Sequence, residues 1–128
     1  MAKNNSKKIL LIEDDPDQVF LYSTKFEMEG LKLLTAQNGV EGLELAKKEK
    51  PDIILLDIVM DEMDGMEVLA SLKKDKATKG VPVVLLTNLV KKELVQKSKQ
   101  MGAAGFWSKT DVLPKDAVER VKQILNIK

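Results

Sequence analysis

Hydrophobic residues are grouped in five short runs, and a longer segment with apolar residues at helical spacing follows each run. The runs lie at residues 8–13, 31–36, 52–57, 83–87 and 104–108. Each run is shorter than a typical helix. The first, third and fourth runs are almost wholly apolar, which is typical of parallel strands buried on both faces of a sheet. The pattern therefore predicts five strands.

The segments after the strands predict five helices, at residues 16–29, 39–49, 66–74, 91–101 and from Pro114 onward. We expect Asp15 to cap the first helix, because a proline that suits the first helical turn follows it. We also expect Phe20 to lie on the inward-facing stripe of this helix. Asn38 and Glu41 have the spacing of a capping box at the start of the second helix.

Strict alternation of strands and helices indicates the α/β class, with a parallel sheet and right-handed crossovers. The 128 residues are close to the usual size of one domain, and 44% of them are hydrophobic, enough for one core. No linker or internal repeat interrupts the pattern. We expect residues 1–8 to be a flexible N-terminus and residues 9–128 to be a single domain.

The composition excludes several kinds of site. The chain has no cysteine and no histidine, so thiolate or imidazole metal sites are absent and any chemistry must use carboxylates, lysines and hydroxyls. Its 21 basic and 20 acidic residues leave a net charge close to zero, which gives no reason to expect binding to nucleic acid or membranes through overall charge. We expect the lysines of segment 91–101 to form a solvated face. With neither a signal peptide nor an apolar run long enough to span a bilayer, we expect a cytoplasmic protein.

Acids, a hydroxyl and a lysine follow four of the predicted strands. Glu13 and Asp14 follow the first, Asp57 the third, Thr87 the fourth and Lys109 the fifth. Ligands of open α/β sheets bind outside the carboxyl ends of the strands, so we expect these groups to converge on one pocket. Mg²⁺ prefers oxygen ligands, and a carboxylate can accept a phosphoryl group whose charge is met by cations and donors. The set predicts Mg²⁺-assisted phosphoryl transfer to a carboxylate.

These segments resemble the receiver domain of two-component response regulators. The matching motifs are Ile-Leu-Leu-Ile-Glu-Asp-Asp-Pro at 9–16, Leu-Leu-Asp-Ile-Val-Met at 55–60, Met-Asp-Gly at 63–65, Leu-Leu-Thr-Asn at 85–88 and Phe-Trp-Ser-Lys at 106–109. All four strand-end landmarks occur in order, and the resemblance extends from Ile9 to Leu125. It implies a flavodoxin-like (βα)5 three-layer sandwich with strand order 2-1-3-4-5.

The resemblance also implies roles for the site residues. Asp57 would accept a phosphoryl group from a histidine kinase or a histidine phosphotransfer protein. The implied Mg²⁺ ligands are the carboxylates of Glu13, Asp14 and Asp57 and the backbone carbonyl of Val59. Thr87 would move toward the phosphate, Lys109 would bind the phosphoryl oxygens, and Phe106 holds the aromatic switch position. The family usually has proline where this chain has Thr110, which leaves either a trans bond with a shifted loop or a retained cis bond after Lys109.

The implied function is that of a single-domain response regulator that signals by protein–protein contact or phosphorelay. We expect it to catalyse only its own phosphorylation and dephosphorylation, and to contact a protein target through helix 91–101, strand 104–108 and the last helix. One alternative is a pseudo-receiver that binds partners without phosphorylation. Another is an aspartyl-phosphate phosphohydrolase, although Val59 stands where that class has a second aspartate. A flavin carrier of the same fold would need a phosphate-binding loop in place of residues 13–15.

Overall fold

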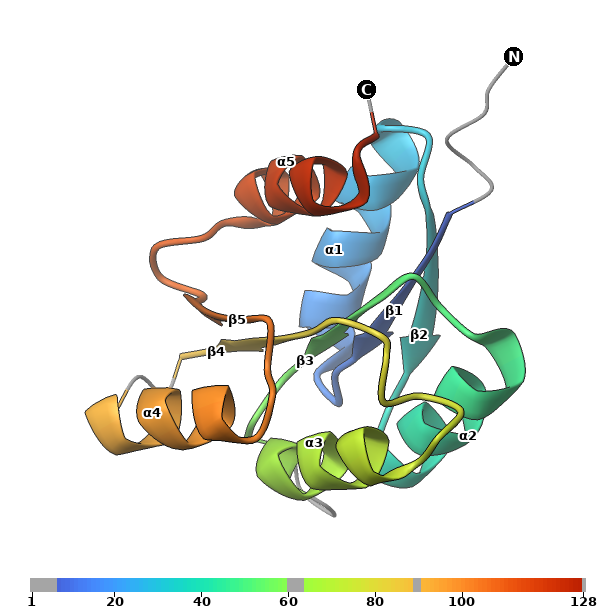
Figure 1. The fold of residues 1–128 in the computed structure, drawn as a ribbon. Coiled ribbons are helices and arrows are strands. Elements are labelled where there is room, and N and C mark those ends of the chain that lie inside the picture. The colour runs from blue at the N-terminus through green and yellow to red at the C-terminus, as the bar shows by residue number, and fades with distance from the viewer. Residues whose placement is uncertain (1–6, 60–63, 89–90, 128) are drawn as a thin grey trace.

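The computed structural model describes residues 7–59, 64–88 and 91–127, which form five parallel strands and five helices in alternation (Figure 1). The strands are β1 (Lys8–Ile12), β2 (Lys32–Ala36), β3 (Ile53–Leu56), β4 (Val83–Thr87) and β5 (Gly105–Ser108). The helices are α1 (Pro16–Met28), α2 (Gly39–Glu49), α3 (Gly65–Lys74), α4 (Lys92–Gln100) and α5 (Pro114–Leu125). The sheet order is β2-β1-β3-β4-β5, which confirms the predicted topology.

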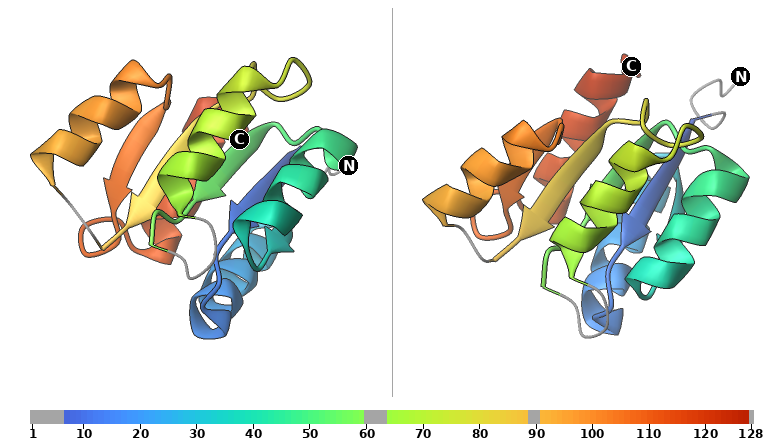
Figure 2. Two further views of the ribbon diagram at one scale, coloured as in Figure 1. Left: turned by 90° about the horizontal axis from the view of Figure 1, so that it is seen from below. Right: turned by 60° about the horizontal axis from the view of Figure 1, so that its bottom comes forward.

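The helices form a layer on each face of the sheet. Helices α1 and α5 cover one face, and α2, α3 and α4 cover the other (Figures 1 and 2). Side chains of alternate strand residues enter opposite layers: Ile9 and Leu11 pack with α1 and α5, whereas Leu10 and Ile12 pack against α2 and α3. Both faces are therefore buried, which explains why the central strands are apolar at nearly every position.

Helix α1 begins as predicted but differs in the face it buries. Asp15 caps it by accepting a hydrogen bond from the Asp17 amide at 2.9 Å. The residues it buries fully are Tyr22 and Phe26, while Phe20 is 69% exposed, so the inward placement of Phe20 was wrong. Each residue turns about 100° around a helix, so the apolar residue next to a buried stripe points to solvent.

The starts of α2 and α3 use different capping arrangements. Asn38 accepts from the Glu41 amide at 2.8 Å, but the Glu41 carboxylate accepts from the Gln37 amide, so the predicted box is displaced by one residue. In α3 the reciprocal bonds between Asp64 and Glu67 are both present. The sequence analysis did not predict this second capping box.

The described part of the N-terminus joins the sheet. Lys8 begins β1, and its amide donates to a carboxylate oxygen of Asp52 at 2.8 Å, while its ammonium pairs with Glu49 at 3.3 Å. Residues 1–6 of the expected flexible segment lie outside the described residues. Among the described helices, none has both the length and the apolar character needed to cross a membrane.

Candidate functional site

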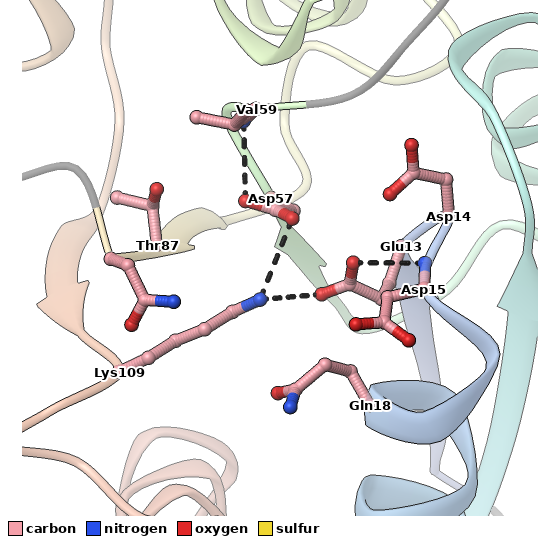
Figure 3. A pocket seen from close by; sticks show the side chains of 9 residues that line it. Glu13, Asp14, Asp15, Gln18, Asp57, Val59, Thr87 and Lys109 are labelled. Carbon is pink, nitrogen blue, oxygen red and sulfur yellow. Dashed lines mark hydrogen bonds and ion pairs between the residues drawn. The ribbon is translucent and has the colours of Figure 1, made fainter.

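A cavity of about 380 Å³ opens at the carboxyl ends of β1, β3, β4 and β5. Its lining residues come from the end of β4, from the segments that follow these strands and from the start of α1 (Figure 3). They are Glu13, Asp14, Asp15, Gln18, Asp57, Val59, Thr87, Asn88 and Lys109. The structure therefore brings together the five groups that the sequence analysis expected to converge.

Backbone hydrogen bonds hold the two buried carboxylates at the edge of the sheet. The Glu13 amide donates to the Ala36 carbonyl at 2.9 Å, and the Asp57 amide donates to the Ile12 carbonyl at 3.1 Å. Their positions continue the sheet one residue beyond the strands. The exposed fractions of Glu13 and Asp57 are only 1% and 6%. Two acids that are this poorly hydrated require a nearby cation or a bound proton.

Lys109 supplies one such cation. Its ammonium lies 2.6 Å from Glu13 Oε1 and 3.4 Å from Asp57 Oδ2 (Figure 3). Its backbone amide donates to the Thr87 carbonyl at 2.9 Å, which anchors the start of the loop that carries it. The described chain contains no cis peptide bond, so Lys109 reaches both carboxylates with a trans bond to Thr110.

The electrostatic environment of Glu13 is unusual for a carboxylate. Burial raises the pKa of Glu13 from 4.5 to about 7, the hydrogen bond from Lys109 opposes that rise, and the negative charge of Asp57 adds to it. The pKa of nearby Tyr22 rises to about 12, first because it is buried and then because of the charges of Glu13 and Asp57. Negative charge in this cavity is therefore only partly compensated by Lys109.

Thr87 and Val59 line the acidic cavity, whereas Phe106 is not among the residues that line it. Thr87 is the last residue of β4 and is fully buried. The Val59 amide donates to Asp57 Oδ1 at 3.2 Å, while the Val59 side chain is 57% exposed. Phe106 pairs with Leu85 in the sheet and packs, half-buried, against the core on the α2 to α4 face.

Besides Asp15, which was predicted only as a helix cap, three residues near the cavity were absent from the predicted set. Gln18 and Asn88 present side-chain amides to it. Gly65 lies behind it, and its amide donates to the Ile58 carbonyl at 2.8 Å. The predicted helix start could have suggested Gln18, which lies in the first turn of α1, three residues after the cap Asp15. Nothing local in the sequence marks the approach of Gly65, since that depends on how α3 docks against β3.

The acidic residues fit a hard divalent cation. Glu13, Asp14 and Asp57 each offer an oxygen atom, and these atoms lie within 4.8 Å of one another. An all-oxygen set with a high density of negative charge matches the preference of Mg²⁺ for a few carboxylates together with water or phosphate oxygens. The residues present therefore fit the metal that the resemblance implies.

The strand order β2-β1-β3-β4-β5, the helices on both faces, and the acids and lysine at the strand ends define the class of α/β folds with an acidic cavity at the carboxyl edge of a parallel sheet. The chain belongs to the response regulator receiver domain family, whose model matches residues 9–122. It is thus a receiver domain of the two-component response regulators, which generally bind Mg²⁺ and become phosphorylated, and its fold is flavodoxin-like.

Relatives of similar length support this assignment. Protein PilH of Pseudomonas aeruginosa is 33% identical over 102 residues, covering 80% of this chain and 84% of that protein. The polar-differentiation response regulator DivK of Brucella anthropi is 31% identical over 119 residues, covering 93% and 96%. The structure of the Vibrio cholerae chemotaxis protein CheY4 is 26% identical, with a TM-score of 0.84 and coverage of 92% and 98%.

Proposed function

We propose that this chain is a phosphorylation-activated response regulator that accepts a phosphoryl group on Asp57. The donor would be a histidine kinase or a histidine phosphotransfer protein. The observation that supports this most strongly is the position of the Asp57 carboxylate, which lies in an open cavity with the Lys109 ammonium 3.4 Å away. The same proposal includes a cytoplasmic location, as the sequence analysis expected.

The chemistry requires one bond to form and one to break. A carboxylate oxygen of Asp57 attacks the phosphorus of a phosphohistidine, and the phosphorus–nitrogen bond breaks with its electron pair returning to the imidazole nitrogen. Negative charge on the three phosphoryl oxygens is met by the Lys109 ammonium and by the hydroxyl of Thr87. The Val59 amide, which now donates to Asp57 Oδ1, holds that carboxylate in one orientation.

Mg²⁺ completes this proposal. The ligands would be Glu13, Asp14, Asp57 and the backbone carbonyl of Val59, as the resemblance implies. When bound, the metal supplies positive charge to the phosphoryl oxygens and offsets the repulsion among the three carboxylates. Lys109 then stabilises the remaining negative charge from the β5 side of the cavity.

The alternatives account less well for these residues. A pseudo-receiver that acts without phosphorylation has no need for a complete set of three acids, a hydroxyl and a lysine in one cavity. A phosphohydrolase needs an acid two residues after the nucleophile, and Val59 cannot donate or accept a proton through its side chain. We therefore propose that the chain catalyses only its own phosphorylation and dephosphorylation, and that it signals by contact or phosphorelay.

The proposal is tested by labelling with acetyl phosphate or phosphoramidate and Mg²⁺, followed by intact-mass measurement. Wild type should gain one phosphoryl group, and Asp57→Asn should gain none because the amide is not a nucleophile. Asp111→Asn is the matched control, since Asp111 is an exposed carboxylate outside the acidic cavity, and it should label like wild type. Equal labelling of wild type and Asp57→Asn would show that the acceptor is another residue.

A further inference from the structure

Lysines are concentrated at one end of the molecule, on the far side from the acidic cavity. Residues 47–52 and 73–79 hold seven of the chain's 21 basic residues and only three acids. These segments contain the ends of α2 and α3. Both helices run opposite to the strands, so they end at the amino edge of the sheet, whereas the acidic cavity opens at the carboxyl edge (Figure 1). The nearly balanced overall charge is therefore unevenly distributed.

Side-chain contacts join the two segments into one surface. Lys47, in the last turn of α2, pairs with Asp75, the C-cap of α3, at 3.2 Å. The Lys73 ammonium donates to the carbonyls of Lys79 and Val81 at 3.2 and 3.0 Å, which holds the loop after α3 against the end of that helix. The exposed lysines of the two segments, called here the lysine surface, are Lys47, Lys48, Lys50, Lys74, Lys76 and Lys79.

The acids within these segments already have partners. Glu49 pairs with Lys8 at 3.3 Å, and the Lys8 amide donates to Asp52 at 2.8 Å. Asp75 is the partner of Lys47. Within the described ranges, Lys47 is the single member of the lysine surface that takes part in an ion pair. The other ammonium groups are therefore available to an anionic partner.

Lys50 indicates that positive charge is kept here at a cost in local stability. It is the C-cap of α2 and has a φ of 50°, in the left-handed region. Glycine is the usual residue at a helix end with this conformation, because a side chain disfavours it. The helix dipole accounts for Lys47 and Lys48 in the last turn, but the strain at Lys50 offsets the same benefit. A lysine at this position therefore points to a use for its charge.

We propose that the lysine surface binds the face of an anionic lipid bilayer. Lipids move freely within a leaflet, so anionic headgroups gather opposite the ammonium groups and neutral lipids face the three acids. Within the described ranges, no exposed large apolar residue lies in 47–52 or 73–79, so the contact is peripheral and nothing inserts into the hydrocarbon. The bilayer repels the acids of the cavity and turns that cavity toward solution. The inference goes beyond the proposed function and does not depend on it.

Three other anionic partners fit the lysine surface less well. Duplex DNA carries one negative charge per ~1.7 Å of axis at fixed positions, so some phosphates would face Glu49, Asp52 and Asp75. The two segments also contain no arginine, the residue best suited to bidentate phosphate contacts. A free phosphate needs converging amides such as those of a helix N-terminus, and the helix ends here are C-termini. An acidic protein would find no exposed large apolar residue in these described segments to serve as the centre of an interface.

The test is cosedimentation of the whole chain with lipid vesicles. At ~0.05 M salt we expect binding to phosphatidylcholine vesicles that contain about 30% phosphatidylglycerol, and no binding to pure phosphatidylcholine. Raising the salt to ~0.5 M should abolish binding, because the contact is electrostatic and exposed charges are then screened.

Charge variants locate the contact. Each lysine near an anionic surface contributes roughly a fivefold factor in affinity, so K48Q/K50Q/K74Q/K76Q should weaken binding at least tenfold. The matched variant K91Q/K92Q/K97Q/K115Q should bind like wild type, since its four lysines are also exposed but lie beside or on α4 and α5. Lys50→Gly should weaken binding without lowering the melting temperature, because glycine suits the left-handed conformation.

A fluorescent label tests the orientation. The chain has no cysteine, so a label can be attached at one introduced residue. Anionic vesicles should shield a label at Lys76→Cys from a water-soluble quencher and leave a label at Asp17→Cys, at the start of α1, exposed.

Several results would overturn the proposal. They are failure to bind anionic vesicles at low salt, equal binding to neutral vesicles, equal weakening in the matched variant, and shielding of the label at Asp17→Cys in place of Lys76→Cys. Tighter binding of the same lysines to duplex DNA at equal phosphate concentration would show that the partner is nucleic acid and not a bilayer.

Discussion

Gly65 shows how a residue without a side chain positions the Asp57 carboxylate. A methyl group added there would lie 2.5 Å from both the Asp57 carbonyl oxygen and the Ile58 Cα atom, closer than real atoms approach. The first residue of α3 therefore packs directly against the backbone of Asp57 and Ile58. Glycine is required at this position by close approach of two backbone segments, not by an unusual φ angle.

Gly65→Ala should consequently displace the backbone of Asp57, the proposed acceptor. We expect a loss of about 1–3 kcal/mol in the free energy of unfolding, the usual cost of overpacking, together with slower labelling of Asp57 by acetyl phosphate. Gly80→Ala is the control, because a methyl group there meets nothing within 4 Å. Urea unfolding and labelling rates check both effects, and unchanged labelling in a folded Gly65→Ala variant would contradict the positioning role.

At the scale of elements, α3 and α4 differ in how firmly they are held. Helix α3 begins with a complete capping box and buries Val68, Leu69 and Leu72. Helix α4 has no side-chain cap at its start, and Ser98 is its single fully buried residue. Few buried contacts mean a low local stability, so α4 is the element best able to adjust when a partner binds.

The capping box of α3 gives a direct test of this difference. Asp64→Ala removes the bond to the Glu67 amide, and we expect it to lower the free energy of unfolding by about 1 kcal/mol. Asp64→Ser, which keeps a capping oxygen, should recover most of the loss. Lys91→Ala at the uncapped start of α4 should change stability by much less. Urea midpoints at constant m-value provide the measurement.

For the whole molecule, the burial of acids at one edge links stability to pH and to metal. The raised pKa of Glu13, about 7 against an ordinary 4.5, means that the folded state holds this proton more tightly than the unfolded state. The folded state then binds more protons between about pH 4.5 and pH 7. Stability of the metal-free protein should therefore fall as pH rises through that window.

Melting temperatures measured from pH 5 to pH 8 in EDTA and in Mg²⁺ test this linkage. In EDTA, Glu13→Gln should remove the part of the decline due to this carboxylate. Because metal binding needs ionised ligands and stabilises only the folded state, the increase caused by Mg²⁺ should grow with pH. Asp14→Ala should reduce that increase. A melting temperature that Mg²⁺ leaves unchanged at pH 8 would contradict the metal site.

Local patterns in the chain were sufficient to predict the five strands, the five helices and the group of site residues. The strand bounds agree within one residue, and the agreement is clearest for β1, β3 and β4, whose apolar runs are buried on both faces of the sheet. The convergence of Glu13, Asp57 and Lys109 followed from the geometry of parallel strands, whose carboxyl ends share one edge. The strand order came from the family resemblance, since the pattern alone allows several orders.

Other features depended on how the elements pack. Tyr22 rather than Phe20 is buried, because docking on the sheet selects which apolar residues of α1 face inward. The 2.6 Å contact between Lys109 and Glu13 joins residues 96 positions apart, and the close approach of Gly65 to Asp57 likewise joins separate segments. The lysine surface needs the ends of α2 and α3 together. Such distances arise only when elements meet, and local periodicity carries no information about them.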